Sequence, residues 1–153
     1  MKTHNFFPVI FSAVLLTSFS KEGLLGCGHT GIKGYAYLVT GNQMPSPNQI
    51  PSQPKGIKTT LYIYSLTNIN EVSRQGNSAF YQNISTELVT QLETDENGYF
   101  RIKLKPGRYS LFVKKGELFY SSQFDEKNNI HPVDVKRGKT TEVVFRVNYD
   151  AVY

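Results

Sequence analysis

The chain is poor in the residues from which most catalytic and metal sites are built. Its 153 residues include one cysteine, three histidines and no tryptophan. A single cysteine, Cys27, excludes an internal disulfide framework and any metal site with several cysteines. The longest apolar run, residues 6–19, is shorter than the ~20 residues of a membrane-spanning helix, which excludes a polytopic membrane protein. We therefore expect a protein that is not an enzyme and holds no metal or cofactor.

Composition and charge are those of one folded, basic domain. Hydrophobic residues make up 39% of the chain and charged residues 19%, and the formal net charge is +5. A chain of this length falls in the single-domain range and can bury a core.

Residues 1–26 have the three-part layout of an export signal. Lys2 gives a positive start, residues 6–19 form the apolar middle, and Gly26 is a small residue at the cut. Residues 24–27, Leu-Leu-Gly-Cys, resemble the lipobox of bacterial lipoproteins. The resemblance implies that Cys27 receives a diacylglyceryl group, becomes the first mature residue, and anchors the protein to a membrane.

The cleavage site, and with it the cellular location, has two alternatives. Lys21 and Glu22 stand where lipoproteins usually carry no charge, and residues 18–20, Ser-Phe-Ser, offer a rival cleavage site. Cleavage there would give a soluble periplasmic or secreted protein. If Cys27 is lipidated, Gly28 with no acidic cluster behind it resembles the sorting signal for the outer membrane, with the domain facing the periplasm.

The remainder of the chain predicts an all-β fold. After residue 28 no helical apolar period persists beyond two turns, whereas period-two alternation between turn residues recurs. Two long segments interrupt it: residues 41–56, with four prolines, and the polar residues 67–84, where we expect a helical turn near 70–74. Seven strands separated by turns indicate a two-sheet sandwich; they are expected at residues 32–40, 58–66, 87–94, 99–105, 108–115, 130–135 and 140–147.

Two turns in the middle of the chain carry the residues that tight turns favour. Asp95 begins and Gly98 ends the first, and Pro106 and Gly107 lie in the second. We expect both to close β-hairpins, with Phe100 on the buried face of the strand between them.

These turns carry a family resemblance. Residues 94–100, Thr-Asp-Glu-Asn-Gly-Tyr-Phe, followed by Pro-Gly-Arg-Tyr at 106–109, resemble the carboxypeptidase regulatory-like domain. The resemblance implies a transthyretin-like (prealbumin-like) seven-strand Greek-key sandwich over residues 31–149, with a short linker at 27–30 and a tail at 150–153. The segments 41–56 and 67–84 are then long loop insertions, and we expect any recognition surface to lie in them.

Tyrosines and a histidine suggest two ligand-directed alternatives. Tyr62 and Tyr64 lie two residues apart, so they share a strand face and would form a stacking platform for a glycan. Tyrosine is also a good strand former, and we favour that structural explanation of Tyr62 and Tyr64 over a binding role. His131 is the histidine on which a small periplasmic hydrolase would depend, provided that an acid and a nucleophile lie beside it.

Some related surface modules close an amide bond between a lysine on the first strand and an Asn or Asp on the last. By that resemblance Lys33 would pair with Asn148 or Asp150 in an isopeptide crosslink. Oxygen-rich stretches at residues 95–97 and 125–129 contain the ligand types of calcium but not the EF-hand pattern, and we interpret them as turns.

Basic residues are concentrated between residues 101 and 115. For an exported chain this charge favours lipid headgroups or acidic glycans rather than nucleic acid, unless it is only a solvated outer face. These basic residues are Arg101, Lys103, Lys105, Arg108, Lys114 and Lys115. Taken as a whole, the sequence predicts a lipid-anchored β-sandwich of the cell envelope with a binding or structural accessory role and a membrane, protein or glycan partner.

Overall fold

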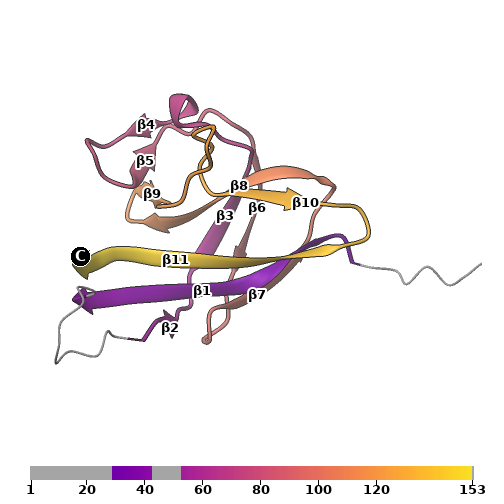
Figure 1. Ribbon diagram of the computed structural model, residues 1–153, viewed down its shortest axis with the longest axis horizontal. Helices are drawn as coiled ribbons and strands as arrows, with labels where there is room; N and C mark the ends of the chain where they lie inside the picture. Colours follow the sequence, from indigo (N-terminus) through magenta and orange to yellow (C-terminus); the bar gives the residue numbers. More distant parts are fainter. Residues whose placement is uncertain (1–28, 43–52, 153) are drawn as a thin grey trace, which may run out of the picture.

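In the computed structural model, which describes residues 29–42 and 53–152, the chain forms two packed β-sheets (Figure 1). The helical structure of the described residues is one short 3-10 turn, η1 (Ile69–Glu71). The strands are β1 (Gly31–Asn42), β2 (Lys55–Gly56), β3 (Thr60–Ser65), β4 (Ser73–Arg74), β5 (Phe80–Gln82), β6 (Leu88–Glu93), β7 (Tyr99–Lys103), β8 (Gly107–Lys115), β9 (Leu118–Tyr120), β10 (Pro132–Val135) and β11 (Thr140–Val152).

The predicted all-β, two-sheet sandwich is confirmed, with eleven strands among the described residues where seven were expected. Each predicted strand is present with slightly different bounds. The four additional strands, β2, β4, β5 and β9, are only two or three residues long. Strands of this length are too short to show a period of two, so alternation in the sequence does not predict them. Each forms by pairing with the backbone of a neighbouring strand.

The smaller sheet contains both the first and the last strand of the described domain. Its order is β11-β1-β2, and β7 also pairs with β1. β1 and β11 are parallel, from Gly31 opposite Thr140 to Asn42 opposite Val152, and lie side by side as the indigo and yellow strands of Figure 1. Both strands therefore start at one end of the sandwich and finish at the other.

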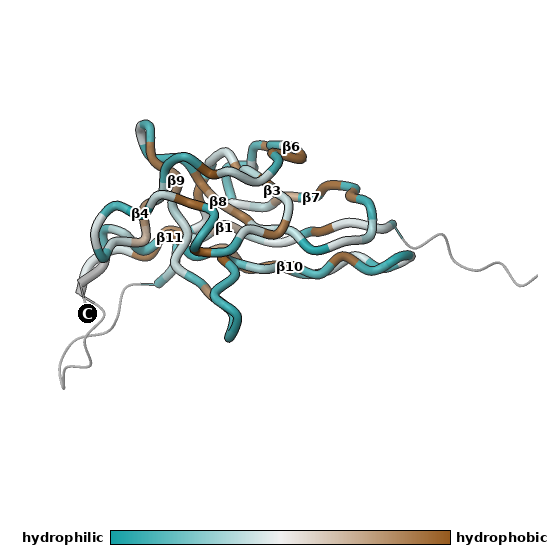
Figure 2. Tube along the Cα trace, turned by 90° about the horizontal axis from the view of Figure 1, so that it is seen from above, coloured by the Kyte–Doolittle hydropathy of each residue, from teal (hydrophilic) through white to brown (hydrophobic). Residues whose placement is uncertain are grey.

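The larger sheet has the order β4-β5-β9-β8-β3-β6, and β10 pairs with the first part of β8. Between the two sheets lies a core to which both contribute, including Ile32 and Phe100 from the smaller sheet and Leu61 and Leu111 from the larger. In Figure 2 the loops that project from this sandwich are largely hydrophilic. The period-two alternation predicted for the strands is present on β11, where Val143, Phe145 and Val147 are buried.

The two central turns do not close hairpins, contrary to our prediction. β6 pairs with β3 in the larger sheet, β7 with β1 in the smaller, and β8 with β3 in the larger again. The turn itself is as predicted, since the Gly98 amide donates to the Asp95 carbonyl over 2.9 Å. Turn chemistry fixes the local reversal but not the partner of the next strand, and here each turn carries the chain from one sheet to the other.

The segment 67–84 is more structured than the polar excursion we expected. It contains η1, β4 and β5, and the expected helical turn is confirmed a residue early, capped by the Asn68 side chain. Its apolar residues Ile69, Val72 and Ile84 pack on a second core that covers the outer face of the larger sheet, around Tyr64 and Phe112. The segment therefore stabilises the sheet by burying its second face.

The other predicted insertion, residues 41–56, lies largely outside the described residues. Its last residues form β2, in which Gly56 pairs with Tyr37 and Lys55 with Leu38 of β1.

Candidate functional site

An exposed group of tyrosines lies on the outer face of the smaller sheet. Strand alternation turns Ile32 and Ala36 of β1 into the core and leaves Tyr35, which is 41% exposed, on the opposite face. Its ring stacks on Tyr37 with centroids 5.8 Å apart and an interplanar angle of 13°. On β7 the paired residue Tyr99 packs against Tyr35 at 5.3 Å. We call Tyr35, Tyr37 and Tyr99 the tyrosine face.

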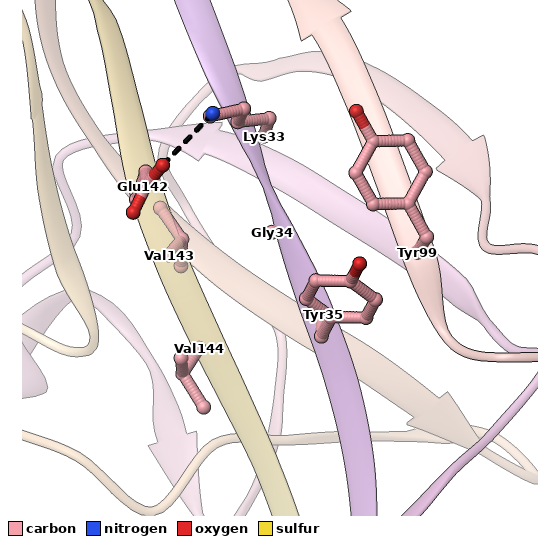
Figure 3. A pocket seen from close by; sticks show the side chains of 7 residues that line it. All are labelled: Lys33, Gly34, Tyr35, Tyr99, Glu142, Val143 and Val144. Carbon is pink, nitrogen blue, oxygen red and sulfur yellow. Dashed lines mark ion pairs between the residues drawn. The ribbon is translucent and has the colours of Figure 1, made fainter.

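A hollow of about 330 Å³ adjoins the tyrosine face (Figure 3). Lys33 and Glu142 form an ion pair at one side, with Lys33 Nζ 2.8 Å from Glu142 Oε1, and Tyr35 and Tyr99 lie at the other. The hydrogen bond and charge of this pair raise the pKa of Lys33 and lower that of Glu142, so both groups carry charge at neutral pH. The lining residues are Lys33, Gly34, Tyr35, Tyr99, Glu142, Val143 and Val144.

Gly34 allows the two terminal strands to approach each other beside this hollow. A Cβ atom at Gly34 would lie only 1.7 Å from the carbonyl oxygen of Val143, its partner on β11. Glycine is therefore required for the pairing that brings Lys33 and Glu142 together.

The side chains around this hollow can make stacking contacts and hydrogen bonds. Tyrosine rings offer apolar faces with polar tips, and the ion pair offers a cation and a carboxylate to ligand hydroxyls. Arg101 on β7 and Arg146 on β11 are exposed and lie opposite Lys33 and Tyr37. The surroundings of the tyrosine face therefore have a positive excess.

The tyrosines singled out from the sequence lie elsewhere. Tyr64 is only 8% exposed and makes edge contacts with Phe112 and Phe119, and the Tyr62 ring also contacts Phe119. Burial raises the pKa of Tyr64. The interpretation of Tyr62 and Tyr64 as an exposed platform is therefore corrected, because the second core occupies their side of the sheet.

The lysine and asparagine proposed for an isopeptide crosslink are not brought together. Lys33 lies opposite Glu142, six residues before Asn148 along β11, and Asn148 bonds to the hydroxyl of Tyr120. The other candidate, Asp150, pairs with Lys115 at 3.2 Å. A crosslink requires neighbouring side chains, so this arrangement does not support the predicted isopeptide bond.

His131 is a buried histidine without catalytic partners among the described residues. It is 4% exposed, and its ring stacks on Phe145 with centroids 4.7 Å apart. Within the part of the chain that the structure describes, no acid or nucleophile bonds to the imidazole. Burial lowers its pKa to about 4, so the ring is neutral near pH 7. This geometry gives no support to a hydrolase built on His131.

The two acidic stretches form turns, in line with their interpretation. Asp95 Oδ1 accepts hydrogen bonds from the amides of Asn97 and Tyr99. Asp125 accepts a hydrogen bond from the side chain of Asn129. This bond is the main reason that the pKa of Asp125 lies below its ordinary value. Both carboxylates therefore accept hydrogen bonds within their own loops, and Asp125 also binds Arg108.

The basic residues between 101 and 115 divide between the two sheets, because β7 and β8 belong to different ones. Arg108 binds Asp134 and Asp125, and Lys114 and Lys115 bind Glu117 and Asp150. The predicted single basic surface is thus divided and partly neutralised.

Cys27 and the predicted export signal lie outside the described residues. Among the described ones, no helix combines the length and apolar character needed to cross a membrane.

The tyrosine face is the feature that sequence reasoning missed. Lys33, Tyr35 and Tyr37 alternate with small or apolar residues, so their shared face was visible in the sequence. The contribution of Tyr99, more than sixty residues later, follows from strand pairing alone. Comparison with known proteins finds no family model that matches the chain and no matching curated sequence.

Proposed function

We propose that this chain is a lipid-anchored module of the bacterial cell envelope with a binding or structural accessory role and no enzymatic activity. One observation carries the proposal: the Leu-Leu-Gly-Cys sequence ends four residues before Gly31, where β1 begins. A folded sandwich directly after an anchoring cysteine is the arrangement expected of a domain held at a membrane. By the sorting resemblance, we propose the outer membrane with the domain facing the periplasm.

The mass of the N-terminal peptide tests the anchor. The protein is recovered from the membrane fraction of cells, alongside a Cys27→Ser variant. We expect a diacylated Cys27 in the parent chain and loss of membrane association in the variant. An unmodified chain that begins at Lys21 would overturn the anchor and make the protein soluble after export.

We also propose that the domain is a carboxypeptidase regulatory-like, transthyretin-like sandwich. The support is that the shared motif residues have definite structural roles. Thr94 Oγ1 accepts from the Thr59 amide and donates to the Ile57 carbonyl, Gly98 packs on β1, and the Tyr109 hydroxyl closes the second turn.

A second candidate function is glycan binding at the tyrosine face, and the hollow in Figure 3 favours it. Stacked aromatic rings bind the apolar faces of sugar rings, while Lys33 and Glu142 offer hydrogen bonds to hydroxyls. The exposed Arg101 and Arg146 beside them favour a glycan that carries carboxylates. This proposal moves the glycan platform from Tyr62 and Tyr64 to Tyr35, Tyr37 and Tyr99.

Titration calorimetry with two oligosaccharides of equal length tests this candidate. We expect oligogalacturonate to bind the processed chain more tightly than a neutral maltooligosaccharide, and Tyr35→Ala to weaken binding about tenfold. Phe124→Ala is the matched control, since Phe124 is 43% exposed, close to the 41% of Tyr35, and lies outside the tyrosine face. Equal effects of the two substitutions, or no binding of either sugar, would exclude the candidate.

A further inference from the structure

One end of the sandwich gathers basic side chains around the first described residues. The Thr30 carbonyl accepts from the Leu104 amide, and Thr30 Oγ1 accepts from the Gly138 amide at 2.8 Å. Gly31 lies opposite Lys103 on β7. The end of β7 and the turn between β10 and β11 therefore flank residue 30. We call the five cations of these two segments the basic end: Lys103, Lys105, Lys136, Arg137 and Lys139.

The charge of the basic end is not neutralised within the described part of the domain. All five side chains are exposed, and none of them forms an ion pair with another described residue. Of the carboxylates near this end, Asp134 and Asp125 bind Arg108, Glu142 binds Lys33, and Glu87 lines a hollow with Lys103 and Lys105. At the opposite end Lys114 and Lys115 are each paired with an acid. The domain is thus electrically polarised along its strands.

The basic end is also the end nearest to the proposed anchor. Cys27 precedes Thr30 by three residues, which span at most ~10 Å when fully extended. That distance is about one Debye length at physiological salt. Whatever path the chain takes between them, a lipid on Cys27 would hold the basic end within electrostatic reach of the membrane surface.

We propose that the basic end docks on the anionic phospholipid headgroups of the membrane that holds the anchor. The inference rests on the lipidation proposed above and adds a defined contact surface to it. Basic residues at a membrane surface each contribute about a fivefold preference for anionic lipid, and a lipid chain combined with a basic patch binds more firmly than either alone. The hydrophilic turn after β10 (Figure 2) is suited to a headgroup layer rather than to the bilayer interior.

This docking orients the whole sandwich. β1 and β11 both begin at the basic end, so the strands would lead away from the membrane and the ion-paired end of Lys115 and Asp150 would be farthest from it. The tyrosine face, on the outer side of the smaller sheet, would then be exposed to the aqueous compartment next to the membrane and accessible to a partner there.

Lysine footprinting on vesicles tests the docking. The processed chain is reconstituted in phosphatidylcholine vesicles with and without 30% phosphatidylglycerol, and the acylation rate of each lysine is read by mass spectrometry. We expect Lys103, Lys105, Lys136 and Lys139 to react more slowly only when the anionic lipid is present, and 0.5 M salt to abolish the difference. Lys114 and Lys115 serve as internal controls whose rates should not change.

Two double variants test whether docking depends on the basic end or on positive charge anywhere on the domain. Lys136→Gln/Lys139→Gln should lower the ratio of docked to free domains about 25-fold, the product of two such contributions, and restore the reactivity of Lys103 and Lys105. Lys114→Gln/Lys115→Gln removes the same charge at the other end and should leave the footprint unchanged. Equal reactivity on both vesicle types, or equal effects of the two variants, would overturn the docking.

The two proposals fail in different ways. If the chain stays on vesicles through a salt wash but shows no lysine protection, the anchor stands and the docking fails. If the processed chain carries no lipid, the anchor fails, and the same footprint with excess anionic vesicles decides whether the basic end binds headgroups by itself.

Discussion

The hydroxyl of Tyr109 donates a 2.8 Å hydrogen bond to the backbone carbonyl of Lys105, four residues earlier. The bond spans the turn that leads from β7 in one sheet to β8 in the other. Tyr109 is itself buried in the core, so the side chain fixes the turn to the interior of the sandwich. This contact gives a physical reason for the Pro-Gly-Arg-Tyr sequence.

Removing that hydroxyl should destabilise the fold. We expect Tyr109→Phe to lower the free energy of unfolding by about 1 kcal/mol, the usual contribution of a hydrogen bond. Chemical denaturation of the processed chain measures the change. Tyr62→Phe is the control, because the Tyr62 hydroxyl has no hydrogen bond to another described residue; a loss as large as that of Tyr109→Phe would contradict the assignment.

Gly98 should be far less replaceable than another glycine of similar backbone conformation. Its φ is +80°, and a Cβ there would lie 2.2 Å from the carbonyl oxygen of Ala36. Gly116 has a φ of +61° with no atom within 4 Å of its Cβ position. Gly116→Ala should therefore cost only the backbone strain of about 1 to 2 kcal/mol.

Gly98→Ala should add a collision with β1 to the same strain. We expect a loss on the order of 4 kcal/mol, or failure to fold. Thermal unfolding of the two variants makes the comparison. Similar melting temperatures would show that the turn does not pack on β1 as tightly as the structure indicates.

Thr94 holds the same region through its side chain. Thr94→Val keeps the shape but leaves the partly buried Thr59 amide and Ile57 carbonyl without their partner. We expect a loss of about 1 to 2 kcal/mol in denaturant unfolding, because polar groups that are shielded from water and left unpaired are costly. Thr90→Val is the control: Thr90 lies on β6, the strand that ends just before Thr94, and its hydroxyl has no hydrogen bond to another described residue, so stability should change by less than about 0.5 kcal/mol.

The sequence was a good guide wherever a feature depends on neighbouring residues. Alternation along one strand correctly assigned Phe100 to the core, and turn chemistry correctly located the reversal at Gly98. Both signals are local, because strand geometry sets the period of two and glycine sets the permitted turn.

Features that depend on which strands pair, or on which segments pack together, could not be predicted from the sequence. Tyr99 follows a turn that suggested a hairpin, yet its strand pairs with β1 and places its ring against Tyr35. Tyr64 alternates like an exposed residue, but residues 67–84 fold over it. In both cases the deciding contact lies in another part of the chain, and no local pattern encodes it.

His131 should make stability depend on pH in a range where few other groups titrate. Its pKa is lowered to about 4 by burial, whereas an unfolded histidine titrates near ~6.5. Between these values the unfolded chain binds a proton that the folded chain does not, so the free energy of unfolding falls as pH falls. From pH 7.5 to pH 5 we expect a loss of about 2 kcal/mol.

Denaturant unfolding at pH 7.5, 6.5, 5.5 and 5 measures this dependence. Glu142 shares a hollow with His131, and the hydrogen bond and charge of Lys33 lower the pKa of that carboxyl, so its titration lies below this range. His131→Asn removes the titrating group and tolerates the positive φ of 38° at this position. The variant should be less stable at pH 7.5 but nearly flat down to pH 5, and a slope equal to that of the parent chain would assign the pH dependence to another group.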